Sequence, residues 1–365
     1  MAHFSRLEKE NRQLAYANLY PKFEILAKKY LTILPFWAIL KSNSFYKEIF
    51  LMANKITIIG SGQVGSTIAY ALTVKGRASE IVLIDIDTKR AMGEAMDIRQ
   101  STPFTSPVNI HDGSYEDAKG SDIVIITSGA ARKPGQSRLD LAQTNVNIMK
   151  SIIPLITKAA PDALYVLVAN PVDVLTYQFI KYSGLPANHI FGSGTMLDTA
   201  RLRTKLADIY EIAQLNVHAY VYGEHGDSSF VPWSQATIAT VPADIYYKAA
   251  VGRNLPALNH DEVEEYVRKS GGIIIDAKKF TNYGIGATVA KICDYLSAGE
   301  NTLLTVSTML DGEYGIKDVA LSILTEIGQK GVINRVEAPL TASELESLRH
   351  SAGCLKDVIA QMNFN

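Results

Sequence analysis

The chain has 365 residues, enough for two domains, and its composition of 47% hydrophobic and 20% charged residues is that of an ordinary globular protein. The formal net charge of −1 gives no indication of a nucleic acid or an anionic membrane as a partner. Cys293 and Cys354 are the only cysteines and form no C-x-x-C pattern, which predicts a reducing, cytoplasmic compartment and no structural zinc or other metal.

Residues 1–51 differ from the rest of the chain in charge and in aromatic content. They carry eight Lys/Arg and four Asp/Glu, and 10 of the 31 aromatic residues. Their longest apolar run is interrupted by Pro35 and is shorter than the ~20 residues that cross a bilayer. We expect Met52 to be the natural start and residues 1–51 to be an upstream extension outside the native core. A targeting or docking arm and an additional ordered helix are the alternatives.

A glycine-rich stretch follows at Lys55–Gly76. A run of β-branched residues, Ile56–Ile59, leads into Gly60, Gly62 and Gly65 in the order G-x-G-x-x-G, and helical spacing of apolar residues follows. Strand, glycine turn and helix together predict a dinucleotide site, because the turn and the helix N-terminus accept a pyrophosphate. The alternative is a purely structural turn.

A second predicted strand, Ile81–Ile84, ends at Asp85, 20 residues after Gly65. A carboxylate at this place binds the ribose hydroxyls of NAD and repels the extra phosphate of NADP. Asp85 therefore favours NAD, although the nearby Arg90 keeps NADP open.

Two further buried strands are predicted at Asp122–Ser128 and Leu164–Ala169, with helical patterns between them. Strands that alternate with helices predict an α/β fold, a Rossmann-type doubly wound parallel sheet. We expect this NAD-binding domain over residues 52–196 and a second, mixed α+β substrate-binding and catalytic domain over residues 197–365.

Several polar groups fall where ligands bind in such sheets, beyond the carboxyl ends of the strands. The segment 130–141 holds three cations, a proline and a glycine, which indicates a mobile lid more than a solvated loop. A cis bond before Pro171 would aim Asn170 at the cleft. Asp198 and Arg201 lie three residues apart on one helix face, a spacing that is usually a surface ion pair. His225 lies between two glycines in a polar turn after an apolar strand, where a structural and a catalytic role are about equally expected.

The C-terminal stretch predicts a packed terminal helix. Thr341 and Glu344 have the spacing of a capping box, and apolar residues follow at helical spacing from Leu345 to Met362.

Taken together, these stretches resemble the L-lactate/malate dehydrogenase family. GSGQVG, the acid that ends the second strand, GQSRLDL, NPVD, LDTAR and GEHGD occur in the family's order, and the resemblance runs from Met52 to the C-terminus. It is closest to the allosteric bacterial L-lactate dehydrogenases, and it implies NAD as cofactor and pyruvate and L-lactate as substrates.

The resemblance also implies roles for individual residues. His225 matches the proton acceptor, Asp198 the carboxylate that orients it, and Arg138 the lid arginine that polarises the substrate carbonyl. Oxidising a 2-hydroxy acid needs a base with a near-neutral pKa, which suits histidine. Arg201 matches the fork that grips the substrate carboxylate. The residues that match substrate contacts are Arg132, Arg138, Asn170, Arg201 and Thr281, and those that match cofactor contacts are Gly60, Gly62, Val64, Gly65, Asp85, Arg90, Tyr115, Gly129, Ala130, Ser151 and Asn170.

Two more residues match an allosteric site. Arg203 and His218 correspond to the fructose 1,6-bisphosphate site of the allosteric bacterial enzymes, in which two subunits clamp the sugar phosphate. The alternative is a basic pair on the surface. The family also implies a homotetramer.

One position argues for a different substrate. Arg132 stands in the lid where lactate dehydrogenases of the family commonly have glutamine, and where malate dehydrogenases have an arginine that pairs with the second carboxylate of oxaloacetate. Glu224 and Thr281, by contrast, resemble the lactate branch. We expect an L-lactate dehydrogenase. Malate dehydrogenase and a non-catalytic NAD-binding protein of the same fold are the alternatives.

Overall fold

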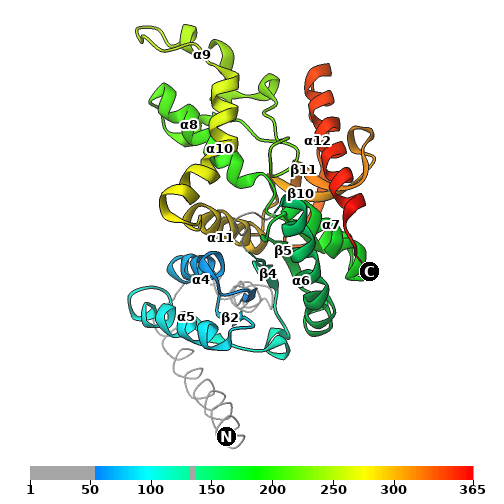
Figure 1. Ribbon diagram of the computed structural model, residues 1–365. Helices are drawn as coiled ribbons and strands as arrows, with labels where there is room; N and C mark the ends of the chain where they lie inside the picture. Colours follow the sequence, from blue (N-terminus) through cyan, green and yellow to red (C-terminus); the bar gives the residue numbers. More distant parts are fainter. Residues whose placement is uncertain (1–53, 131–136, 365) are drawn as a thin grey trace, which may run out of the picture. The chain divides into compact units, whose positions relative to one another are not determined.

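The structure, a computed structural model, describes residues 54–130 and 137–364 (Figure 1). The proposed upstream extension at residues 1–51 and the lid residue Arg132 lie outside the described residues. None of the helices that the structure describes is both long and apolar enough to cross a membrane.

A six-stranded parallel region forms the first part of the main sheet. Its strand order is β3-β2-β1-β4-β5-β6, and every neighbouring pair in it is parallel. This order and direction confirm the doubly wound fold class. The strands are β1 (Lys55–Ile59), β2 (Glu80–Ile84), β3 (Asn109–Asp112), β4 (Ile123–Ile126), β5 (Leu164–Leu167) and β6 (Ile190–Gly192).

Two of these strands end earlier than their apolar runs predict. The run Asp122–Ser128 pairs only as Ile123–Ile126, and Leu164–Ala169 only as Leu164–Leu167. Beyond Ile126, the N–H groups of Thr127 and Ser128 both donate to the carbonyl of Ile59, so the regular ladder stops there. The residues that follow are therefore no longer paired in the ladder, and they form the ligand edge of the sheet.

Helices cover both faces of this parallel region. Their ends follow local sequence signals: Gly76 ends α4 in the left-handed conformation, and Asp87 accepts the Arg90 N–H at the start of α5. Ser137 and Asp140 form a capping box on α6. The helices are α4 (Gln63–Lys75), α5 (Thr88–Gln100), α6 (Arg138–Ala159) and α7 (Val172–Tyr182).

The second part of the chain extends the same sheet with antiparallel strands. Strand β10 (Thr302–Asp311) pairs antiparallel with β6 and is followed by β11 (Lys317–Gly328) and β12 (Gly331–Arg335). A separate antiparallel sheet contains the short strands β7 (Val217–His218), β8 (Thr237–Ile238) and β9 (Val241–Pro242). The helices of this part are α8 (Met196–Tyr210), α9 (Ala243–Ala249), α10 (His260–Lys278), α11 (Tyr283–Ser297) and α12 (Ala342–Gln361).

The C-terminal helix confirms its sequence signals. Thr341 and Glu344 exchange both hydrogen bonds of the capping box at the start of α12, and Leu348 and Leu355 are buried. This mixed α+β arrangement is the one expected for the second part of the chain.

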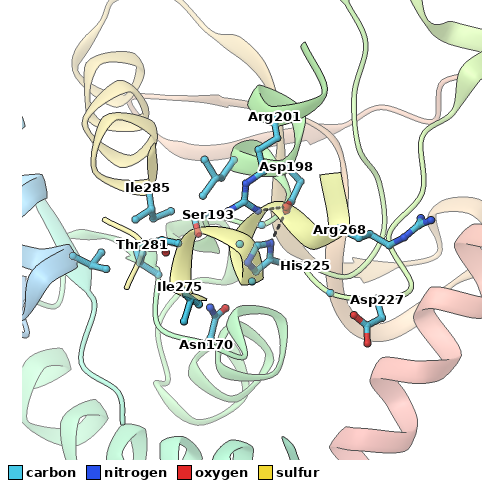
Figure 2. A pocket seen from close by; sticks show the side chains of 17 residues that line it. Asn170, Ser193, Asp198, Arg201, His225, Asp227, Arg268, Ile275, Thr281 and Ile285 are labelled. Atoms are coloured by element: carbon cyan, nitrogen blue, oxygen red, sulfur yellow. Dashed lines mark hydrogen bonds and ion pairs between the residues drawn. The ribbon is translucent and has the colours of Figure 1, made fainter. Parts of the chain in front are cut away.

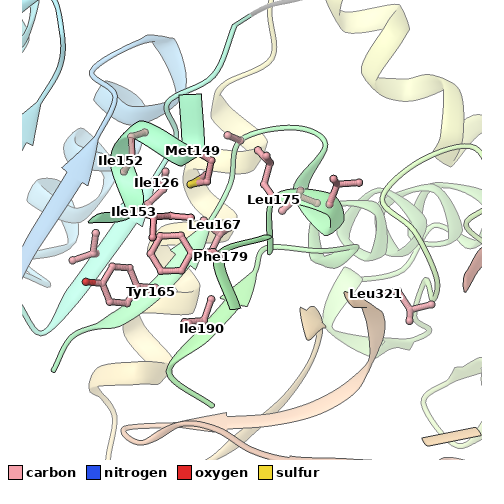
Figure 3. Close-up of a cluster of buried hydrophobic side chains, with 14 of the residues drawn as sticks. Ile126, Met149, Ile152, Ile153, Tyr165, Leu167, Leu175, Phe179, Ile190 and Leu321 are labelled. Carbon is pink, nitrogen blue, oxygen red and sulfur yellow. The ribbon is translucent and has the colours of Figure 1, made fainter. Parts of the chain in front are cut away.

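Alternate residues of the parallel strands pack into two separate cores, one on each face of the sheet. Ile58 belongs to the core under α4, α5 and α11, whereas Ile59 belongs to the core under α6, α7 and α12. In the second core the rings of Tyr165 and Phe179 lie 4.9 Å apart (Figure 3). Burying each such side chain contributes about 1.5–3 kcal/mol, so these cores hold the strand ends, and hence the site, in place.

Candidate active site

The segment that carries His225 is held by long-range backbone contacts. Tyr222 bridges Phe230, and Gly223 exchanges backbone hydrogen bonds with Ser322 of β11. The continuous apolar strand expected before His225 is thus reduced to isolated bridges. Gly223 has a φ of +92°, and a Cβ at this position would lie 2.6 Å from the buried Oγ of Ser351, so only glycine fits here.

His225, Asp198 and Arg201 form one connected group (Figure 2). The Oδ2 atom of Asp198 lies 2.5 Å from Nδ1 of His225, and its Oδ1 atom accepts a hydrogen bond of 2.8 Å from Arg201. Asp198 is only 6% exposed, whereas the His225 side chain is 25% exposed and lines a cavity. The predicted helix-face pair is therefore an interior pair that also reaches the histidine.

The charges in this group shift both pKa values. The Asp198 charge raises the pKa of His225 above its usual 6.5; burial and Arg201 oppose this shift, and Asp173 adds to it. Burial raises the pKa of Asp198, but the charges and hydrogen bonds of His225 and Arg201 outweigh it, so the net pKa lies below 3.8. The histidine is therefore poised to hold a proton near neutral pH.

The group opens into a cavity of about 280 Å³. The polar side chains of Asn170 and Thr281 also line this cavity, and the bond between Asn170 and Pro171 is cis. Another part is apolar and includes Val64, next to the glycine turn, and Ile285. The cavity can therefore hold a small polar molecule beside a flat apolar one.

Arg138, the expected lid arginine, does not line this cavity. It begins α6 with its side chain 69% exposed, and it forms an ion pair with Asp227, which does line the cavity. The structure thus brings Arg138 to the rim of the site only through Asp227.

The glycine turn leaves room for a phosphate. Gly60 has a φ of +100°, and a Cβ on Gly65 would lie 1.9 Å from the Gly60 carbonyl oxygen, so the third glycine is needed for the turn to pack. Around Gly62 a Cβ would meet nothing within 4 Å. Helix α4 also begins without a side-chain cap or an acidic residue in its first turn, so its N–H groups suit an anion.

Asp85 stands beside this turn at the end of β2. Its Oδ2 atom accepts hydrogen bonds from the N–H and the hydroxyl of Ser61, at 2.7 and 3.1 Å, and its Oδ1 atom accepts one from the Asp87 N–H. Burial, and to a smaller extent the Asp85 charge, raise the pKa of Tyr115.

The other expected cofactor residues lie at two places. Gly129 and Ala130 follow β4, and the Ala130 N–H donates to buried Asn145. Arg90 lies on α5 and Ser151 on α6, and both are exposed on helices that flank the sheet.

Arg203 and His218 line a second cavity, of about 480 Å³, together with Lys291. Arg203 donates to the Ala219 carbonyl at 3.0 Å and stacks over the Tyr220 ring. The structure therefore brings the expected allosteric pair together, away from His225.

Three residues near the site were missed from the sequence. Buried Asn145 donates to the Asn170 carbonyl at 2.6 Å and joins it to Ala130, Asp173 accepts the His225 N–H, and Arg268 lines the cavity. At Asp173 a single acid between Val172 and Val174 was the available signal, whereas Asn145 lies among other polar residues and gave none.

A dinucleotide turn beside a cavity with a histidine–aspartate pair and a partly buried arginine defines a nicotinamide-dependent dehydrogenase acting on a small carboxylate. The chain belongs to the lactate/malate dehydrogenase family. Residues 54–192 match the family's NAD binding domain and residues 195–364 its alpha/beta C-terminal domain. The resemblance noted in the sequence is thereby confirmed, and the cofactor is NAD.

Individual relatives agree with this membership. The chain is 43% identical over 310 residues to L-lactate dehydrogenase of Thermoanaerobacterium saccharolyticum, covering 85% of this chain and 99% of that protein. It is 43% identical over 309 residues to the L-lactate dehydrogenase of Acetivibrio thermocellus, covering 85% and 97%. Among solved structures, the minor L-lactate dehydrogenase from Enterococcus mundtii is similar with a TM-score of 0.82 and 35% identity, over 86% of this chain and all of that one.

Proposed function

We propose that this chain is an NAD-dependent L-lactate dehydrogenase that interconverts pyruvate and L-lactate. The observation that carries the proposal is the hydrogen-bonded group of His225, Asp198 and Arg201 in a cavity that also reaches Val64 of the glycine turn. Relatives at 43% identity named L-lactate dehydrogenase support the same activity.

The chemistry follows from what each side chain can do. His225 binds Asp198 through Nδ1, which leaves Nε2 to take the hydroxyl proton of lactate or to return it to pyruvate. Asp198 holds the imidazole and stabilises its charged form. Arg201, anchored through one nitrogen, has the rest of its guanidinium fork for the substrate carboxylate. NAD, when bound, supplies the hydride acceptor or donor.

The remaining roles in the active site are proposals of the same kind. Arg138 would polarise the substrate carbonyl after leaving Asp227, and Asn170 and Thr281 would contact the substrate. The groups proposed to hold NAD are Gly60, Gly62, Val64, Gly65, Asp85, Arg90, Tyr115, Gly129, Ala130, Ser151 and Asn170. The open space at Gly62 and the uncapped start of α4 support this set. We assign residues 52–196 to the NAD-binding domain and 197–365 to the catalytic one.

The test is NADH oxidation by the protein that starts at Met52, with pyruvate and separately with oxaloacetate. A clearly higher kcat/KM for pyruvate is expected. A preference for oxaloacetate would instead favour malate dehydrogenase, and no turnover of either would favour a non-catalytic NAD-binding protein.

Arg132 is the residue that we expect to set the preference between pyruvate and oxaloacetate. Replacing it by glutamine, Arg132→Gln, is expected to lower oxaloacetate turnover far more than pyruvate turnover. The arginine would pair with the second carboxylate of oxaloacetate, whereas it has no partner when it faces the methyl group of pyruvate. An equal fall for both substrates would mean that Arg132 has a structural role.

We further propose that fructose 1,6-bisphosphate activates the enzyme at Arg203 and His218 and that the enzyme is a homotetramer. The cavity shared by these residues and Lys291 supports the first proposal. The exposed apolar residues Met92, Met96 and Ile273 support the second. The sugar bisphosphate should lower the KM for pyruvate, and Arg203→Gln should abolish this response. Sedimentation equilibrium measures the subunit number, and a monomer would contradict the tetramer.

A cytoplasmic location is also proposed. Both cysteines are free thiols, as in a reducing compartment. Fractionation of the source cells tests this, since enzyme recovered outside the cytoplasm would contradict it.

A further inference from the structure

Asn282 is a buried asparagine that the proposed mechanism does not use. It immediately precedes α11 and is only 6% exposed. An asparagine at this place usually accepts a backbone N–H of the helix that it precedes. The Asn282 side chain forms no such cap, so its amide group serves other elements of the structure.

Both ends of the Asn282 amide are used. Its Nδ2 atom donates a hydrogen bond of 2.9 Å to Oγ1 of Thr67 on α4, and its Oδ1 atom accepts one of 2.7 Å from Nζ of Lys278, the last residue of α10. The amide therefore joins the end of α10, the start of α11 and α4. A buried amide that lost either partner would be left with an unpaired polar atom, which is costly.

The bond from Lys278 closes the turn that carries Thr281. Only residues 279–282 separate α10 from α11, and Lys279 among them has a φ of +74°. This left-handed conformation is unfavourable for a residue with a side chain, so the turn needs contacts that hold it. Thr281 lies in this turn and lines the cavity beside His225. Its place in the cavity therefore depends on how the turn is closed.

The bond to Thr67 ties the same turn to α4. The Thr67 hydroxyl donates at 2.6 Å to the carbonyl of Gln63, the first residue of α4, so its oxygen is left to accept from Asn282. The two helices also approach closely here, because a Cβ on Gly286 of α11 would lie 2.5 Å from Cγ2 of Thr67. The turn is thus held against the helix that follows the glycine turn.

We infer that Asn282 is a positioning residue that places Thr281 in the substrate cavity by tying its turn to α4. The inference rests on the proposed contact between Thr281 and the substrate. Val64 on α4 and Ile285 on α11 line the same cavity as Thr281 (Figure 2), so a shift of the turn relative to α4 changes the cavity where the substrate binds. Helix α4 is held by its own buried face, so the cofactor side of the site does not depend on Asn282.

The experiment compares wild type with Asn282→Ala in the full-length protein. The KM for pyruvate should rise about tenfold, because a displaced Thr281 binds the substrate less well. The kcat and the KM for NADH should each stay within about twofold of wild type, since a contact made equally in the ground state and the transition state affects KM alone. Equal losses for pyruvate and NADH would show a general structural role and would overturn the inference.

Thr67→Val isolates the bond to α4, because it removes the acceptor and keeps the shape of the side chain. It should raise the KM for pyruvate as Asn282→Ala does, and the double variant should be no worse than Asn282→Ala alone, since both changes break one bond. Thr288→Val is the matched control. Thr288 is buried on α11, and its hydroxyl bonds within that helix to the Gly284 carbonyl. Additive effects in the double variant, or a raised KM in the control, would overturn the inference.

Hydrogen exchange separates this inference from the proposed activity. In the unliganded protein the backbone amides of residues 279–283 should exchange about tenfold faster in Asn282→Ala and in Thr67→Val than in wild type. The amides of residues 60–65 should be unchanged. This result is expected even if wild type turned over no pyruvate. Thr67→Val carries the test alone if Asn282→Ala does not fold, and exchange at the wild-type rate in the turn would overturn the inference.

Discussion

The glycine turn and the His225 group both lie at the ligand edge of the structure, but the first consists of backbone and the second of charged side chains. The turn uses backbone: Gly60, Gly62 and Gly65 lie within six consecutive residues, and their task is to leave side chains out. The His225 group uses buried charges from separate elements, with Asp198 on α8, Asp173 on α7 and the histidine on a segment held by β11 and α12.

This difference implies two kinds of sensitivity. A substitution in the turn acts sterically, because the added Cβ either clashes with a neighbouring atom or does not. A substitution in the His225 group acts through charge, because each buried ion depends on its partners. The four predictions that follow test this contrast, from the largest expected effect to the smallest.

His225→Asn should reduce turnover by about 10³-fold or more, because it removes the proton acceptor. Binding of NADH, followed by its fluorescence, should remain nearly unchanged, since the turn is untouched. An equal loss of binding and turnover would contradict both the assignment of the base and the separation of the two regions.

Gly65→Ala should destabilise the protein by roughly 3 kcal/mol, because the new Cβ would lie 1.9 Å from the Gly60 carbonyl oxygen. Gly62→Ala is the matched control. Its Cβ would meet nothing within 4 Å, so stability should hold while NADH binding weakens where the pyrophosphate approaches. Urea unfolding and NADH titration measure the two effects. Equal stability losses in both variants would show that the clash is relieved in some other way.

The His225–Asp198 pair should make stability depend on pH. The pKa of His225 is raised, chiefly by the Asp198 charge, so its contribution is complete below about pH 6.5 and is lost as the pH rises through the folded-state value. The pKa of Asp198 is lowered, so its contribution is present above its usual value and is lost on acidification. His225→Asn should therefore cost about 2 kcal/mol at pH 5 and less at pH 9, by urea unfolding. A cost that grows with pH would contradict this account.

Thr341→Ala should cost about 1 kcal/mol, because it removes the cap of α12. Thermal unfolding measures this loss, and pyruvate turnover at 25 °C should be unchanged. Ser347→Ala, whose hydroxyl bonds only within the helix to Ser343, is the control and should cost less. A matching fall in kcat would show that the His225 segment depends on the helix cap.

The elements that sequence predicted well are those with local causes. The strands at Ile56–Ile59 and Ile81–Ile84, the turn glycines and the capping box at Thr341 all depend on neighbours within a few residues. The strand ends at Ser128 and Ala169 were placed too late, because the apolar run continues after the ladder has stopped. The parallel direction of these strands followed from the alternation of strands and helices, whereas their order in the sheet came from the structure.

The composition and order of motifs alone determined that this chain is a two-part α/β dehydrogenase with a dinucleotide turn, because glycine spacing and hydrophobic period are local properties. The tertiary structure decided which charges meet. Asp198 could have been a surface partner of Arg201, and Asp173 gave no signal as a partner of His225, yet both are buried against the histidine. A buried charge depends on residues far along the chain, and only folding brings them together.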